Sequence, residues 1–352
     1  MSMTAIRWAS HSWNPFIGCS IVSPGCSACY AMHQAERILR MQRGRMGASH
    51  YEGAVTVVKG KPVWTGAINQ ASEKTRFEPL SWARPRSIFV GSMSDFFHPS
   101  ADDAWRVEAL AVMALTPQHT YLILTKRSAD TRRFLADPAT QAAVWTRSLE
   151  LPRARDFLAR RMEQIAPGHW PLKNVALGVS VEDQKRAHER LPDLEAAPAA
   201  LKFASCEPLL GELHIRRYLP FLDLVIAGGE NDLGDRMTHP EWMRGLYSQC
   251  RAAGKKFHLK QWGKWAAAEQ LPGDQVSEFF QMEARVAPAP NDPNCRTRLL
   301  DRAGRVYRYD QQLEAAEARA IMMLRVGTAH SGRLLDGREH DDVFGDVLGE
   351  VA

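Results

Sequence analysis

The sequence predicts an α/β fold in which six or seven parallel strands curl into a partial (β/α) barrel. Three observations lead to this prediction. Short apolar runs alternate with segments of helical character, each run begins as an unbroken apolar stretch, and each run ends in small or polar residues. Unbroken apolar runs are typical of parallel strands buried on both faces, and alternating strands and helices are joined by right-handed crossovers.

The elements are expected in the following order. A short first strand at about 13–18 precedes a helix. The six apolar runs predicted as strands are SIFVGSMSD (87–95), TYLILTKR (120–127), NVALGVSVED (174–183), LKFASCEP (201–208), DLVIAGGE (223–230) and KKFHLKQWG (255–263). Helices are expected in 101–115, 129–164, 182–195 and 240–253, with Asp183 and Pro240 as helix-start residues.

Two regions stand outside this alternation. Residues 46–86 are predicted to form an insertion, in which VTVVKGKPVWTG is typical of a β-hairpin that turns at Lys59-Gly60-Lys61. Residues 266–352 mix polar, proline-bearing and helical pieces. We expect them to form a C-terminal extension that packs on a barrel domain of residues 1–265.

Composition restricts the classes of protein that the chain can represent. Apolar residues make up 45% and charged residues 24% of the 352 residues, as in ordinary globular proteins, and the chain has no apolar run of eighteen residues. The N-terminus lacks the apolar core of a signal peptide, so we expect a cytoplasmic protein with no membrane partner. Thiols stay reduced there, which favours metal binding or catalysis over disulfides. The net charge of +5 permits a nucleic-acid partner without requiring one.

Polar groups follow each of the six predicted strands. The active site of a parallel barrel forms where the C-terminal ends of its strands meet the following loops. Six successive strand ends with such groups exceed the ordinary polarity of loops, so we expect a functional site there. The groups are Ser92, Ser94 and Asp95; Thr125, Lys126 and Arg127; Ser180 and Glu182; Ser205, Cys206 and Glu207; Gly228, Gly229 and Glu230; and Lys260 and Gln261.

The stretch GCSIVSPGCSACYA (18–31) contains three of the six cysteines, Cys19, Cys26 and Cys29. Three thiolates can hold three irons of a [4Fe–4S] cluster and leave the fourth iron open to a small molecule. Zinc is the main alternative, because His33 would complete a four-ligand set with the spacing C-x6-C-x2-C-x3-H. Three free thiols are a further alternative. The loop's position at the same barrel end as the polar strand ends favours the cluster.

The sequence resembles the radical S-adenosylmethionine (SAM) superfamily, and more closely a three-cysteine, radical-SAM-like family associated with phages and mobile elements. The matching stretches, from about residue 8 to 345, are SWNPFIGC and SPGCSACYA, PVWTG, FVGSMSDFFHP, LTKR, NVALGVSVED, SCEPLLG, LVIAGGEN, KQWG and GRLLDGREHD. The resemblance implies a [4Fe–4S] cluster on the three cysteines. It also implies that SAM binds the open iron and is cleaved reductively to methionine and a 5′-deoxyadenosyl radical, which takes hydrogen from the substrate.

The sequence departs from the superfamily pattern in two ways. The cysteine spacing is C-x6-C-x2-C rather than the usual C-x3-C-x2-C. Ala28 stands where an aromatic residue usually precedes the last cysteine, and Tyr30 follows that cysteine instead. The second departure puts in doubt the usual packing of an aromatic ring near the adenine.

The resemblance implies cofactor-binding roles for several strand-end residues. Ser92, Ser94 and Asp95 lie where the superfamily binds the methionine amino group, and a carboxylate suits an ammonium. Ser180 and Glu182 are candidates for the ribose. Gly228-Gly229-Glu230 matches the superfamily's glycine-glycine-glutamate motif in its letters but comes several strands later, so it is a candidate for the ribose or the substrate.

The catalytic candidates are Cys206, Lys126 and Glu207. Lys126, with Arg127, is expected to bind the SAM carboxylate or a substrate phosphate, or else to be a solvated pair that opens a helix. Cys206 is expected to donate hydrogen to the substrate radical, with Glu207 disfavouring its thiolate, or else to be a small buried residue.

A nucleic acid or nucleotide is the expected substrate. The segment 255–265 interleaves four lysines with two tryptophans and a phenylalanine, which suits stacking on bases; a buried strand flanked by surface lysines is the alternative. Similarity to spore photoproduct lyase and the phage association imply modification or repair of DNA, RNA or a nucleotide, with a flavodoxin or ferredoxin as reductant. A zinc-bearing nucleic-acid-binding module without catalysis and an iron–sulfur redox or sensor protein remain open.

Overall fold

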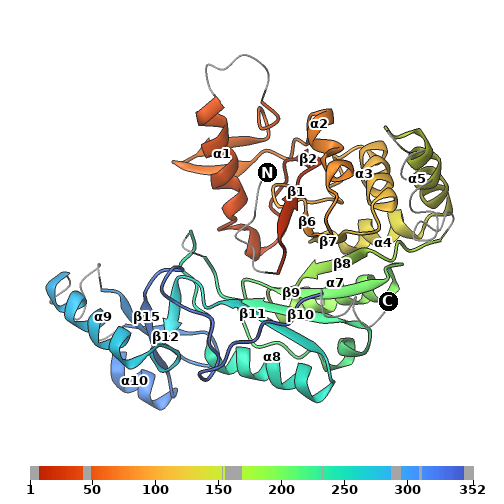
Figure 1. Cartoon of the computed structure of the whole chain (residues 1–352). Coiled ribbons are helices and arrows are strands. Elements are labelled where there is room, and N and C mark those ends of the chain that lie inside the picture. The colour runs from red at the N-terminus through yellow and green to blue at the C-terminus, as the bar shows by residue number, and fades with distance from the viewer. Residues whose placement is uncertain are drawn as a thin grey trace. The chain divides into compact units, whose positions relative to one another are not determined.

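The computed structural model describes residues 8–42, 49–152, 154, 169–231, 233–286, 295–308 and 311–344. Seven parallel strands form a curled half-barrel that is flanked by helices, which confirms the predicted fold class (Figure 1). The strand order follows the chain: β1 (His11–Trp13), β6 (Ser87–Val90), β7 (Thr120–Thr125), β8 (Val175–Ser180), β9 (Leu201–Cys206), β10 (Leu224–Gly228) and β11 (Lys256–Gln261). Each of the six predicted apolar runs contains one of the strands β6 to β11.

The chain divides into two compact units. Unit 1 comprises Met1–Ser180 and Glu189–Phe203, and unit 2 comprises Val181–His188 and Ala204–Ala352. The division therefore falls within β9, whereas the sequence placed a domain boundary after residue 265.

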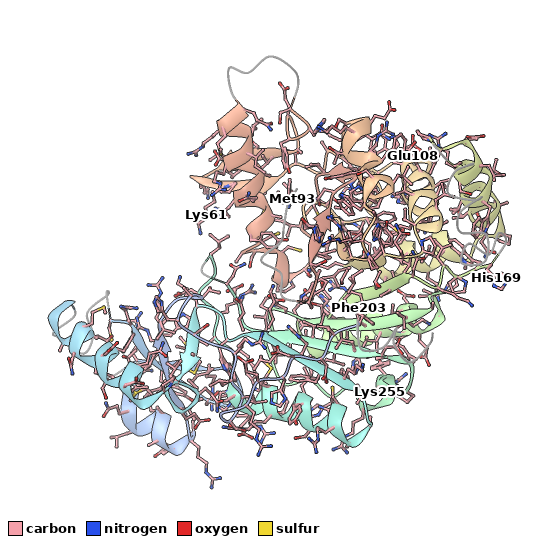
Figure 2. All side chains as sticks on the ribbon, in the orientation of Figure 1. Lys61, Met93, Glu108, His169, Phe203 and Lys255 are labelled. Carbon is pink, nitrogen blue, oxygen red and sulfur yellow. The ribbon has the colours of Figure 1, made fainter. Side chains whose placement is uncertain are left out.

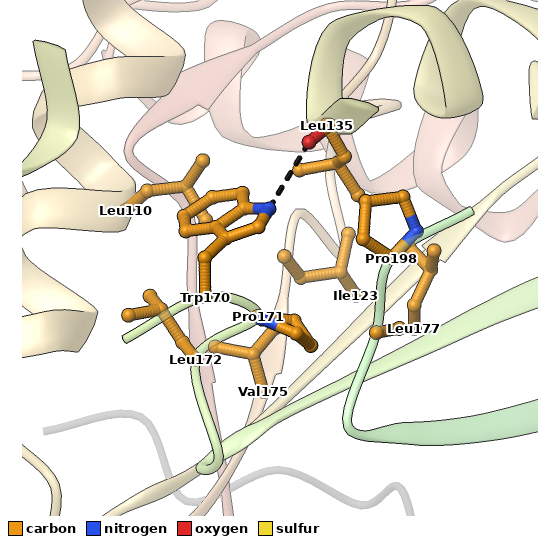
Figure 3. A pocket seen from close by; sticks show the side chains of 10 residues that line it. Leu110, Ile123, Leu135, Trp170, Pro171, Leu172, Val175, Leu177 and Pro198 are labelled. Carbon is orange, nitrogen blue, oxygen red and sulfur yellow. Dashed lines mark hydrogen bonds between the residues drawn. The ribbon is translucent and has the colours of Figure 1, made fainter. Parts of the chain in front are cut away.

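The strands of unit 1 are covered on one face by α3 (Asp103–Leu115) and α4 (Ser128–Ala136). Ile123 of β7 and Leu177 of β8 meet Leu110 and Leu135 of these helices around a small cavity, closed by Trp170, whose indole N–H donates to the carbonyl of Leu135 at 3.1 Å (Figure 3). The cavity measures about 20 Å³ and its lining is almost wholly apolar. A space of this size and lining is a packing void rather than a ligand site.

The other face of these strands is the inner face of the half-barrel. Phe203, labelled on β9 in Figure 2, packs there with Trp8, and their ring centroids lie 6.1 Å apart. A Cβ added at Gly178 would lie 2.4 Å from the Phe203 ring, so glycine makes room for the ring. Alternation along β8 puts Ser180 on the same inner face as Gly178.

The predicted helix 129–164 is wrong as a single helix, because Asp137 and Pro138 interrupt it in its first third. Helix α4 ends at Ala136, and α5 (Pro138–Glu150) begins with Pro138 in its first turn. The Asp137 carboxylate caps α5 by accepting from the backbone N–H of Ala139 at 2.8 Å. The last part of the predicted helix, 155–164, lies outside the described residues.

The predicted first strand is also wrong in its bounds. Strand β1 ends at Trp13, and β2 (Phe16–Ile17) leaves the large sheet to pair antiparallel with β5 (Asn69–Gln70) of the insertion. The predicted hairpin is confirmed as β3 (Val55–Val58) and β4 (Lys61–Trp64), which pair antiparallel. Lys59 and Gly60 form its turn with φ values of 49° and 76°, as in a two-residue hairpin loop.

Helix α1 (Tyr30–Gln42) packs on this hairpin through a buried apolar cluster that includes Ala35, Val55 and Trp64. The remaining elements of unit 1 include α2 (Glu73–Arg76) and the 3₁₀ helices η1 (Pro24–Cys26) and η2 (Glu78–Ser81). Helix α7 (Gln184–Ala196) follows Asp183, whose carboxylate accepts from the backbone N–H of Arg186 at 2.8 Å. This confirms Asp183 as a helix-start residue.

In unit 2, β10 and β11 pair in parallel and α8 (Pro240–Ala252) packs against them (Figure 1). Pro240 is the first residue of α8, as predicted, and His239 caps the helix. The C-terminal extension has its own antiparallel sheet in the order β12 (Trp265–Ala267), β15 (Ile321–Arg325), β13 (Thr297–Leu300) and β14 (Val306–Tyr307). The 3₁₀ helices η3 (Arg216–Phe221) and η4 (Ala268–Gln270) and the helices α9 (Gly273–Val286) and α10 (Gln312–Glu317) complete unit 2.

The end of the described chain lies along β11. The backbone N–H of Leu259 donates to the carbonyl of His340 at 2.9 Å, and the indole N–H of Trp262 donates to the carbonyl of Leu334 at 2.8 Å. In the part of the chain that the structure describes, no helix combines the length and apolar character needed to cross a bilayer.

Candidate functional site

The cysteine loop lies beside the C-terminal end of β6. The backbone N–H of Gly18 donates to the carbonyl of Met93 at 3.1 Å, and Gly18 forms a parallel bridge with Ser94. Cys19 follows directly, Cys26 ends η1, and Cys29 immediately precedes α1. The three cysteines are therefore carried by a loop at the end of the sheet where a half-barrel forms its active site.

The insertion holds the backbone of this loop. The backbone N–H of Gly66 donates to the carbonyl of Cys19 at 3.1 Å, and that of Ala71 donates to the carbonyl of Pro15 at 3.0 Å. Gly18 has φ of +114°, and a Cβ on it would lie 2.1 Å from the carbonyl oxygen of Ala67. Glycine is thus required next to Cys19 both by the backbone conformation and by the close approach of the insertion.

Cys19 and Cys29 are partly buried against the apolar cluster on α1, which also includes Met93 (Figure 2). Burial raises the pKa of the Cys19 thiol to about 12; Asp95 raises this pKa further, and Arg127 opposes the shift. Burial likewise raises the pKa of Cys29, which Lys126 opposes. Cys29 interacts electrostatically with both Cys19 and Cys26, so the three thiols are neighbours.

Asp95 is buried, at 6% exposure, and joins the ends of β6 and β7. Its Oδ1 accepts from the hydroxyl of Thr125 at 2.7 Å and from the backbone N–H of Phe97 at 3.1 Å. Its Oδ2 accepts from the backbone N–H of Lys126 at 3.0 Å and from Nη1 of Arg127 at 2.9 Å. Because each oxygen already has two protein donors, a ligand ammonium would have to displace one of them. The contact of Asp95 with the amino group of SAM stays a prediction. The contacts that are observed hold the ends of β6 and β7 together.

Arg127 connects Asp95 to the cysteine loop. Its Nη1 also donates to the Cys19 sulfur at 3.9 Å, and its Nη2 donates to Ser20 Oγ at 2.7 Å. Ser20 Oγ lies 2.9 Å from Nε2 of His98, whose Nδ1 accepts from the backbone N–H of Ser100 at 3.1 Å. Burial, and next Arg127, lowers the pKa of His98 to about 4, so the ring is neutral at pH 7 with its hydrogen on Nε2.

Two further hydroxyls belong to residues predicted for the site. Nζ of Lys126 donates to Ser180 Oγ at 3.0 Å, so the two predicted residues are brought together. Ser94 Oγ is buried and has no hydrogen-bond partner in the described part of the chain. Ser92 instead bonds to two side chains of the protein: its hydroxyl exchanges hydrogen bonds with the Asn14 amide, and its carbonyl accepts from Tyr30 Oη at 3.0 Å.

Sequence reasoning did not select Ser20, His98 or Asn14. Ser20 lies next to Cys19 and His98 lies within the matched stretch FFHP, so their neighbours were the available signal. Nothing in the sequence shows that they contact Arg127 or Ser92, because these contacts join distant parts of the chain.

The other predicted site residues belong to unit 2. Glu207 forms an ion pair of 2.6 Å with Lys260. Glu230 is held by Arg236, whose Nε donates to it at 2.9 Å. A Cβ on Gly229 would lie 1.8 Å from the carbonyl oxygen of Trp262, so this glycine permits a close approach of two backbones. Gly228 lies beside Glu207, since a Cβ on it would come within 3.5 Å of that side chain.

Cys206 is fully buried, and it interacts electrostatically with Cys250 of α8 and with Glu182. Burial raises its pKa well above the usual value for a thiol. Alternation along β9 puts Cys206 on the face opposite to Ser205. Cys206 therefore lies on the helix-covered side of the strand, and this placement gives no support to the predicted role as a hydrogen donor.

The donor set at the cysteine loop fits a soft metal centre, because thiolates favour iron–sulfur clusters and zinc, and the three thiols are neighbours. Across the described residues, no three His, Cys, Asp or Glu side chains are grouped as metal ligands. His33, the fourth ligand of the zinc alternative, lies in the first turn of α1 and is half-buried.

Comparisons with known proteins give one family. No curated protein and no solved structure matches the chain. A family model described as "Protein of unknown function (DUF5131)" matches residues 3–344. This match spans nearly the whole chain, including the cysteine loop, the half-barrel strands and the C-terminal extension. The chain therefore belongs to the DUF5131 family.

Proposed function

We propose that the protein is a radical SAM enzyme that carries a [4Fe–4S] cluster on Cys19, Cys26 and Cys29. The observation that carries the proposal is the place of these neighbouring thiols, beside the C-terminal end of β6 and next to the buried cation Arg127. A three-thiolate cluster has one iron open to a small molecule, and the open end of a half-barrel is where substrates bind.

The residues around the loop have distinct roles in this proposal. When bound, the cluster would supply one electron to break a carbon–sulfur bond of SAM, releasing methionine and a 5′-deoxyadenosyl radical that takes hydrogen from the substrate. Lys126 offers an ammonium to the SAM carboxylate, and Ser94 offers a hydroxyl that has no hydrogen-bond partner among the described residues. Asp95 fixes Arg127 and the backbone of Lys126, which keeps both cations beside the thiols.

A nucleic acid or nucleotide is the proposed substrate class, and a flavodoxin or ferredoxin is the proposed one-electron reductant. The support is the resemblance and the net charge of +5. The segment 255–265 gives no further support, because Phe257, Trp262 and Trp265 are all buried. These aromatic rings belong to the core of unit 2 and do not present faces to bases.

Anaerobic reconstitution with iron and sulfide tests the proposal. We expect a brown protein with about four irons per chain. Cys19→Ala, Cys26→Ala and Cys29→Ala should each lose the cluster, whereas Cys250→Ala, the matched control in α8, should retain it. With dithionite and SAM, the reconstituted protein should release 5′-deoxyadenosine and methionine.

Two outcomes would replace this proposal with another class. Stoichiometric zinc without iron uptake would indicate a zinc-binding module. An intact cluster that neither cleaves SAM nor changes its electron paramagnetic resonance signal when SAM is added would indicate a redox or sensor protein.

A further inference from the structure

A buried ion pair lies beside Cys19, one of the predicted metal ligands. Arg127 and Asp95 form a buried ion pair of 2.9 Å, with side-chain exposures of 6% and 7%. Both act on the Cys19 sulfur, which accepts a hydrogen bond from Arg127 at 3.9 Å and also interacts electrostatically with Asp95. One cation is thus held against a single predicted ligand atom, and its partner anion is held against that cation.

The geometry of the pair leaves Arg127 little freedom. The guanidinium contacts Asp95 and Cys19 through Nη1 and Ser20 through Nη2. The neutral His98 ring donates from Nε2 to the same Ser20 hydroxyl, which therefore cannot rotate away without losing a partner. A planar guanidinium fixed by three partners keeps its charge in place when the charge of its surroundings changes.

We propose that the Arg127–Asp95 pair sets the reduction potential of the metal centre on the cysteine loop, Arg127 raising it and Asp95 lowering it. This inference rests on the proposed function, because it requires a redox-active centre at Cys19. Reduction adds one electron to the centre, so a nearby positive charge stabilises the reduced state and a nearby negative charge destabilises it. Burial strengthens both effects, since solvent screens the two charges weakly. Hydrogen bonds to cluster sulfurs act in the same sense as the positive charge.

Removing each charge separately gives opposite expectations. Arg127→Gln leaves the Asp95 charge uncompensated, so the potential should become more negative. Asp95→Asn leaves the Arg127 charge uncompensated, so the potential should become more positive. If the two substitutions only disturbed the local structure, the reduction potential would not be expected to shift in opposite directions in the two variants. Opposite shifts of the reduction potential in the two variants would therefore show that the charges of Arg127 and Asp95 act on the metal centre.

The test is an anaerobic redox titration of the reconstituted full-length protein, followed by electron paramagnetic resonance. At a fixed potential, Arg127→Gln should lower the ratio of reduced to oxidised centre at least tenfold, a shift of about 59 mV for one electron. Asp95→Asn should raise the same ratio. Arg127→Lys, which keeps the charge, should lie between Arg127→Gln and the wild type. Arg133→Gln removes an arginine that is 78% exposed on α4, the helix that begins directly after Arg127, and should leave the ratio unchanged.

Each outcome decides the inference. Shifts of Arg127→Gln and Asp95→Asn in the same direction, or ratios within threefold of the wild type for both, would overturn it while leaving the cluster proposal intact. If Arg127→Gln fails to hold a centre, Arg127→Lys and Asp95→Asn decide by the same criterion. A wild-type protein that takes up no iron would overturn the proposed function, and this inference with it.

Discussion

Asp95→Asn is expected to destabilise the fold by about 3 kcal/mol. The substitution keeps the shape of the side chain but replaces one oxygen by an NH₂ group. Each Asp95 oxygen accepts two hydrogen bonds, so either orientation of the amide turns its NH₂ toward two donors. It also leaves the Arg127 guanidinium buried without its carboxylate, and breaking a buried pair from one side costs about 3–5 kcal/mol. We take the lower end because Asn still offers one acceptor oxygen.

Urea unfolding followed by tryptophan fluorescence measures this loss, with the denaturant dependence of the free energy expected to stay unchanged. Asp130→Asn is the matched control, because Asp130 pairs with Arg133 at the surface and such pairs are worth about 0–1 kcal/mol. The double variant Asp95→Asn/Arg127→Met should lose less than the sum of the single losses, since it removes both charges. If Asp95→Asn is as stable as Asp130→Asn, the network around Asp95 does not hold these strand ends together.

Three other predictions follow from the described contacts. Burial lowers the pKa of His258 to about 4 from 6.5. The stability that the neutral ring contributes is therefore complete above pH 6.5 and is lost as the pH falls towards 4. The loss, up to about 3 kcal/mol, should appear in the midpoints of urea unfolding and should be absent in His258→Gln. Gly229→Ala places a Cβ 1.8 Å from the carbonyl oxygen of Trp262 and should lower the free energy of unfolding by at least about 3 kcal/mol. The control Gly211→Ala has open space around its Cβ and should lower it by under about 1 kcal/mol in the same assay. Lys126→Met should weaken SAM binding to the reconstituted protein about tenfold or more, because it removes the proposed charge-assisted contact to the SAM carboxylate. Unchanged affinity in equilibrium binding would refute that contact and leave Lys126 with its hydrogen bond to Ser180.

The strands that were predicted correctly are those whose burial is visible in their own residues. Strands β7 and β10 are apolar on both faces, so their runs need no information about partners. The first strand was misplaced because Phe16 and Ile17 are equally apolar but pair with Asn69 and Gln70. An apolar run shows that a segment is buried, and it does not show which strand lies beside it.

The same limit applies to the site. Its chemistry-bearing residues stand at strand ends and in a cysteine-rich loop, and those positions are readable from the chain. The sequence does not show that both oxygens of Asp95 already accept hydrogen bonds. Their donors include Thr125, Lys126 and Arg127 at the end of the next strand, which reach Asp95 only in the folded chain. For the same reason the sequence could not show that Cys206 interacts electrostatically with Cys250 on the helix-covered side of β9.

The hydrogen bonds from the insertion to the cysteine loop have a consequence for the order of synthesis. Cys19, Cys26 and Cys29 leave the ribosome well before Gly66 and Ala71, which hold the backbone on either side of Gly18. We expect the nascent cysteines to remain without a fixed shape until the chain has grown past the insertion. The proposed metal centre should therefore be loaded late, on a chain that has completed at least its first sheet pairings, and iron offered to a shorter nascent chain should meet thiols without a fixed arrangement.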